Sequence, residues 1–256
     1  MLSDSGVLSD SGVLSDGFVL LTGLLAGTLG GVVGTGSSML LLPVLVLRFG
    51  PKEAVPIMAV AAIMANLARV AAWWREVDPR ALLAYAVPAV PAAMLGARTL
   101  LALPAGWIEA ALGLFFLAMI PGRRWLQARA LRIGLWQLAM AGAMVGFLTG
   151  LVLSTGPLSV PAFAAFGLMK GGLLATEAAA SLAVYTTKAA TFRTLGALPT
   201  HSLLRGLVVG STLMLGAFLG KAVVQRMGMQ QFQLALDAVM LVSGLSLLWD
   251  ALSHAA

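Results

Sequence analysis

Apolar residues run through this chain in long segments, and polar residues are confined to short intervals between them. The apolar segments cover residues 18–33, 39–49, 51–76, 80–103, 107–120, 133–153, 158–168, 173–192, 203–227 and 232–249. As helices, the longer ones cross the roughly 30 Å hydrocarbon core of a bilayer. They lack the residue-by-residue alternation of membrane β-barrel strands. The pattern predicts an all-α polytopic membrane protein with 8–10 apolar segments in total.

The composition supports a membrane protein and excludes several other classes. Of the 256 residues, 60% are hydrophobic and only 10% are charged, whereas soluble domains carry about 25% charged residues. Almost no sequence is left for an appended catalytic module. The net charge of +6 is expected to reflect cytoplasmic loops and not a nucleic-acid partner. The chain has no cysteine, which excludes disulfides and thiolate metal sites. We expect an integral protein of the inner or plasma membrane, in contact with lipid.

The chain divides into two similar halves. We predict a flexible acidic tail at residues 1–16, a first transmembrane repeat at 17–122, a basic cytoplasmic linker at 123–132 and a second transmembrane repeat at 133–256. Each half consists of a broken or re-entrant helical hairpin plus three transmembrane helices. Because each half then crosses the membrane an odd number of times, the two repeats are predicted to be inverted relative to each other.

Each predicted hairpin contains a break of small, hydrogen-bonding residues. The breaks are Gly34-Thr35-Gly36-Ser37-Ser38 and Ser154-Thr155-Gly156. The segments that follow, 39–49 and 158–168, reach only about 16 Å as helices and cannot span the core. Non-helical backbone inside a bilayer is tolerated where it is buried in protein or lines a wet cavity. Paired breaks in corresponding halves indicate a transporter site, and close packing of helices through small residues is the alternative.

A basic residue lies well inside the long helix that comes after each break and its short segment. Arg69 and Lys188 occupy nearly equivalent positions relative to the two breaks. Asn66 shares the face of Arg69 at three residues' separation, and Thr187 adjoins Lys188. A cation inside a membrane helix is costly and indicates function, although snorkelling of each base toward an interface is the alternative. We therefore predict that an anion binds between the two breaks, with one base on each flank.

The predicted substrate-binding set combines the breaks with the buried bases. Its members are Gly36, Ser37, Ser38, Asn66, Arg69, Ser154, Thr155, Gly156, Thr187 and Lys188. Two acids in apolar surroundings, Glu177 and Asp237, are expected either to pair with a base or to carry a coupling proton. His201 and His254 fall near helix ends, where loop histidines are more common than metal ligands. We predict no metal site, no cofactor and no catalytic residue, because no His/Glu pair or Ser–His arrangement is spaced for chemistry.

The two breaks also carry a family resemblance. Gly34-Thr35-Gly36-Ser37-Ser38 is followed by Pro43, and Val152-Leu153-Ser154-Thr155-Gly156 is followed by Pro161. In this spacing the chain resembles the sulfite exporter TauE/SafE family (TSUP), whose halves each carry a G-x-G-G-G motif before a proline. The turn at residues 49–55 and Leu95-Gly96-Ala97-Arg98 are further likenesses. The resemblance implies a permease for sulfur-containing or organic anions, such as sulfite, sulfoacetate or sulfolactate. Here hydroxyl residues replace two glycines in each motif.

The residues and the resemblance together predict a secondary transporter that moves a small anion of the sulfite, sulfonate or carboxylate class across the inner membrane by alternating access. Its partners are the anionic substrate, membrane lipid and a coupling proton or sodium ion, and the sequence leaves a homodimer open. Two alternatives remain: a passive anion channel, and a non-transporting scaffold or assembly factor. The short loops offer little surface for the scaffold role.

Overall fold

The computed structural model describes residues 37–128, 132–151 and 156–224, together with positions 19, 21–24, 27, 234, 237, 241, 244, 245, 248, 249, 251 and 252. The predicted tail at 1–16 and most of the first and last apolar segments lie outside these residues. Helices account for nearly all of the described chain, and this part contains no strand. The predicted all-α fold class is confirmed.

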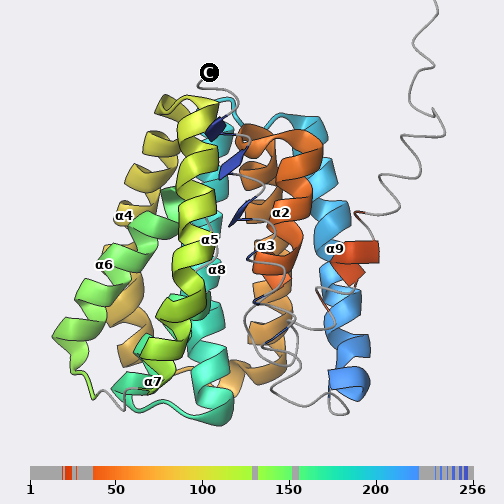
Figure 1. Ribbon diagram of the computed structural model, residues 1–256. Coiled ribbons are helices and arrows are strands. Elements are labelled where there is room, and N and C mark those ends of the chain that lie inside the picture. The colour runs from red at the N-terminus through yellow and green to blue at the C-terminus, as the bar shows by residue number, and fades with distance from the viewer. Residues whose placement is uncertain are drawn as a thin grey trace, which may run out of the picture.

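The helices lie side by side as one bundle, with α4 and α6 along one edge and α9 along the other (Figure 1). Their bounds are α2 Ser37–Phe49, α3 Pro51–Trp73, the 3-10 turn η1 Trp74–Glu76, α4 Pro79–Ala102, α5 Ala105–Ala128, α6 Leu135–Leu151, α7 Gly156–Phe166, α8 Lys170–Thr194 and α9 Thr200–Val224. These ranges agree with the predicted segments to within a few residues, except at the end of α5. That helix continues through Pro121 to Ala128, so the first residues of the predicted linker are helical.

Short helices follow both breaks, as predicted. With 13 residues in α2 and 11 in α7, the two helices are about 20 Å and 16 Å long and cannot span a bilayer core of about 30 Å. Two described helices are long and apolar enough to cross on their own, over Lys52–Ala71 and Pro79–Ala102. Both short helices pack against longer ones: α2 against α3, and α7 against α6 and α8.

The turns around α3 and α4 show why these helices begin where they do. Gly50, between α2 and α3, has φ 73°, a left-handed conformation that glycine adopts without steric cost, and Pro51 then opens α3. Asp78 caps α4, because its carboxylate accepts from the backbone N–H groups of Arg80 (2.8 Å) and Ala81 (3.0 Å). The Asp78 N–H donates to the Thr176 hydroxyl of α8 at 2.9 Å, which fixes the start of α4 beside α8.

Helices α4 and α6 run parallel and pack backbone to backbone. Glycines one turn apart on α6 face α4 so closely that a side chain would collide with its main chain. A Cβ atom at Gly146 would lie 2.7 Å from the Ala89 Cα atom, and one at Gly142 would lie 3.1 Å from the Tyr85 Cα atom. Small residues placed every four positions along α6 allow this close approach, as is usual between membrane helices. Close packing through small residues, the alternative explanation of the breaks, thus occurs along α6, the helix that ends just before the second break.

Helix α3 runs antiparallel to α8 and parallel to α9. Near the end of α3, Arg69 contacts Glu177, which lies near the start of α8. At the start of α3, Glu53 accepts from Ser202 (2.9 Å) and Arg205 (2.7 Å) of α9, which begins just after α8 ends. Because α3 and α8 are the long helices that come after α2 and α7 in the two predicted halves, their opposite directions are those that inverted repeats require. The repeat relationship itself stays a prediction.

Candidate functional site

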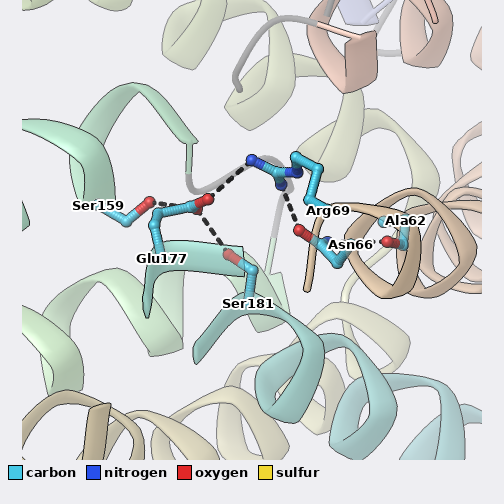
Figure 2. Close-up of polar contacts among 6 residues, drawn as sticks. All are labelled: Ala62, Asn66, Arg69, Ser159, Glu177 and Ser181. Atoms are coloured by element: carbon cyan, nitrogen blue, oxygen red, sulfur yellow. Dashed lines mark hydrogen bonds and ion pairs between the residues drawn. The ribbon is translucent and has the colours of Figure 1, made fainter. Parts of the chain in front are cut away.

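A buried carboxylate on α8 collects donors from three helices (Figure 2). Glu177 is 1% exposed. Its Oε1 atom accepts from the Ser159 hydroxyl of α7 at 2.9 Å and from the Ser181 hydroxyl of α8 at 2.7 Å. Its Oε2 atom accepts from Arg69 Nη1 of α3 at 2.9 Å. A buried ionised carboxylate requires such compensation, because desolvation of the charge is otherwise prohibitive.

Arg69 makes the link between the two predicted halves. Its second guanidinium nitrogen donates to the Asn66 side-chain oxygen, and the Asn66 amide in turn donates to the Ala62 carbonyl at 2.8 Å. Asn66 therefore orients the guanidinium toward Glu177 (Figure 2). The Arg69 side chain keeps 20% exposure. The acid pairs with a base, as one of the two expected roles for Glu177 requires, and Asn66 shares the face of Arg69 as predicted.

Lys188 lies deeper in the bundle, at the end of α6. Its side chain is 1% exposed, and its ammonium group donates to the Thr149 carbonyl and lies 5.7 Å from the centre of the Phe192 ring. Thr149 belongs to the last turn of α6, whose carbonyls have no partner within the helix. The lysine thus caps α6 where the negative end of the helix dipole favours a cation. Among the residues that the structure describes, no carboxylate neutralises it.

The two buried bases lie at different depths along α8. Glu177, which binds Arg69, precedes Lys188 by 11 residues, which is about 16 Å along a helix. Arg69 therefore contacts the first third of α8, and Lys188 lies in the last third of that helix, beside the end of α6.

The remaining predicted site residues fall into two groups. Gly36, Ser154 and Thr155 lie outside the described residues, and for Ser37, Ser38 and Gly156 only the backbone is described, at the first turns of α2 and α7. Thr187 is half-buried and lines an outer groove, on a different face from Lys188. Asp237 is 8% exposed and has an interaction partner of its own. No group of three His, Asp or Glu side chains that could hold a metal occurs in the described part of the chain.

Several residues of the site were missed by reasoning from sequence. Ser181 stands four residues after Glu177, a spacing that places both on one helix face, so it could have been found. Ser159 belongs to the polar stretch after the second break, but nothing in its spacing indicates contact with Glu177. Tyr85 of α4 is 1% exposed, and its hydroxyl has no hydrogen-bond partner among the described residues. A lone tyrosine in an apolar segment gives no signal of this kind.

The arrangement suits binding and movement of a charged solute. It combines an ion pair between α3 and α8, an ammonium at the end of α6 that no described carboxylate neutralises, and the two short helices α2 and α7. These groups can attract an anion and supply hydrogen bonds to it.

Comparison with known proteins identifies the family. The family model described as "Sulfite exporter TauE/SafE" matches residues 19–247. Neither a curated protein nor a solved structure matches the chain. Because the match covers most of the sequence, the chain belongs to the TauE/SafE family, and the predicted resemblance is confirmed. The protein is therefore an integral membrane protein of a transporter family for sulfite-type anions.

Proposed function

We propose that this TauE/SafE family member is a secondary transporter that moves a small sulfur-containing or organic anion, of the sulfite, sulfonate or carboxylate class, across the inner membrane by alternating access. Family membership supplies the general activity. The anion class also follows from the family, whereas the binding position and the mechanism are inferred from the buried charges.

The observation that carries the proposal is the environment of Lys188. An ammonium group has three donors, and one of them goes to the Thr149 carbonyl. Full burial without a carboxylate is expensive for a cation, so the group is suited to a charged partner that arrives from outside the chain. Arg69 is less suited to that role, since Glu177 already neutralises it.

In this proposal the anion binds beside Lys188 in the gap between α6 and α7. The backbone N–H groups at the start of α7, near Gly156, and the hydroxyls of Ser154 and Thr155 replace water around the anion. The equivalent stretch of Gly36, Ser37 and Ser38 at the start of α2 contributes from the first half. Removal of the anion from water is thereby offset by charge-assisted hydrogen bonds.

Alternating access requires the two halves to move against each other. The Arg69–Glu177 pair joins α3 of one predicted half to α8 of the other, so it closes one side of the pathway in this conformation. A coupling proton or sodium ion would act through Glu177 or Asp237, because neutralising Glu177 weakens its bond to Arg69. The inverted repeats supply the equivalent closure on the opposite side.

Anion-dependent thermal stability of the detergent-purified protein tests the proposal. Sulfite, sulfoacetate, acetate and chloride are compared at equal ionic strength in the wild type and in Lys188→Met, with Lys52→Met as control, because Lys52 is an exposed lysine at the start of α3. We expect one anion to stabilise the wild type and Lys52→Met selectively, through binding to the folded state, and Lys188→Met to lose that shift while staying folded. An unchanged shift in Lys188→Met would remove the lysine from the site.

Flux into proteoliposomes then separates a transporter from a channel. We expect accumulation of the selected anion against its gradient when a proton or sodium gradient is imposed. Flux that only follows the anion's own gradient would favour a passive channel.

A further inference from the structure

A groove between α4 and α8 opens on the outer surface of the bundle and has no role in the proposed transport. It has a volume of about 350 Å³, within the usual range for small-ligand sites. Its α4 wall is apolar, formed by Val90 and Met94, and ends at Arg98. Its α8 wall carries threonines one turn apart, among them Thr191 and Thr194. The groove is therefore apolar along one side, hydroxyl-lined along the other and cationic at one end.

Arg98 is the unusual member of this groove. Its side chain is exposed, and within the described residues it has no acidic partner. It stands four residues before the end of α4 at Ala102, about 6 Å from the helix end. A guanidinium group at that depth lies at the level of lipid headgroups, which is where long basic side chains direct their charge.

The neighbouring threonines complement this charge. Thr191 donates its hydroxyl proton to the Thr187 carbonyl at 2.8 Å, and Thr194 donates to the Thr191 carbonyl at 3.0 Å. Because these donors are already used, each hydroxyl oxygen is left as an acceptor, while Arg98 keeps its five donors. Arginine binds phosphate oxygens through two parallel hydrogen bonds.

We infer that this groove is a binding site for one anionic phospholipid. The phosphate pairs with Arg98, a headgroup hydroxyl donates to the exposed Thr194, and the start of an acyl chain lies along Val90 and Met94. The groove is lined mainly by exposed residues of α4 and α8, so lipid around the bundle is the ligand that reaches it directly. Basic pockets between transmembrane helices are suited to anionic headgroups. The inference does not depend on the anion site at Lys188.

Lipid binding to the purified, delipidated protein tests the inference. Phosphatidylglycerol and phosphatidylcholine with the same acyl chains are titrated separately, and bound lipid is counted by native mass spectrometry. We expect phosphatidylglycerol to bind the wild type, and Arg98→Gln to bind it at least about tenfold more weakly, as the loss of a hydrogen bond between charged groups implies. The matched control is Arg80→Gln, at the opposite end of the same helix and equally exposed, which should bind as the wild type does.

Three outcomes would overturn the inference. Equal binding of phosphatidylglycerol to Arg98→Gln and Arg80→Gln would remove Arg98 from the site. Equal binding of the two lipids to the wild type would show that headgroup charge is not recognised. If inorganic sulfate at millimolar concentration displaces the lipid from the wild type, the groove binds soluble anions. Because Lys188→Met leaves the groove intact, its lipid binding should be unchanged even if the proposed transport site is wrong.

Discussion

The Arg69–Glu177 pair should respond very differently to loss of its base and loss of its acid. Glu177 is 1% exposed, while Arg69 keeps 20% exposure and a second partner in Asn66. Arg69→Gln leaves a buried carboxylate whose remaining donors, among the described residues, are two serine hydroxyls. Glu177→Gln keeps an oxygen for those serines and leaves a partly exposed guanidinium that still donates to Asn66. We therefore expect Arg69→Gln to be the more destabilising change.

The magnitudes follow from the cost of leaving a charge uncompensated. Removing one partner of a buried pair costs about 3–5 kcal/mol, which applies to Arg69→Gln. Losing one hydrogen bond between charged groups costs about 1.5–3 kcal/mol, which applies to Glu177→Gln. The double variant removes both charges and allows the two amides to bond, so its cost should fall below the sum of the single costs by about 1–3 kcal/mol.

The assay is unfolding of the four proteins in mixed micelles with increasing sodium dodecyl sulfate, followed by circular dichroism. The double-mutant cycle gives the coupling between the two side chains directly. Costs that add to within about 0.5 kcal/mol, or a larger loss in Glu177→Gln than in Arg69→Gln, would refute the reasoning that Glu177 is the desolvated partner. Anion flux should be measured on the double variant as well, because a loss of flux in Arg69→Gln alone could result from instability of the protein.

Two further predictions concern packing and use the same unfolding assay. Tyr85→Phe should raise stability by about 1 kcal/mol, because it removes a buried hydroxyl that lacks a described partner and keeps the ring contact with Phe163 at 4.8 Å; a loss of stability would contradict this. Gly146→Ala should cost about 1–3 kcal/mol because Ala89 backbone blocks the new methyl group, whereas Gly122→Ala, with open space around it, should gain from helix propensity.

The pattern of apolar segments predicted the helices well, because the thickness of the bilayer constrains the length of a helix that spans it. The observed α4, Pro79–Ala102, differs from the expected 80–103 by one residue at each end. The end of α5 was misplaced at Pro121, where proline and the following arginines were taken as a loop. The helix continues because proline removes only one hydrogen bond, and other helices can support the chain around it.

The sequence predicted the buried charges and gave pairing with a base as one of two roles for Glu177, but it did not indicate that this base is Arg69. The cost of a cation in a membrane helix singled out Arg69 and Lys188 correctly as buried or partly buried groups. The similar positions of Arg69 and Lys188 suggested that both bases flank one anion. In the structure, Arg69 forms an ion pair with Glu177, and Lys188 donates to a carbonyl at the end of α6. Which base meets which acceptor depends on helix directions and rotations, and a periodic apolar pattern does not encode these.

The packing of α4 against α6 and of α3 against α9 has a consequence for how the chain is made. In each pair, one helix belongs to the first predicted half and the other to the second. When the ribosome has released only α2 to α5, α4 still exposes to lipid the face that later meets the α6 glycines. The first half is therefore expected to stay only partly packed in the membrane until the second half has been inserted. If the chain is divided after Ala128 and the two halves are encoded separately, each half should be degraded when it is produced alone. Both halves should accumulate when they are produced together.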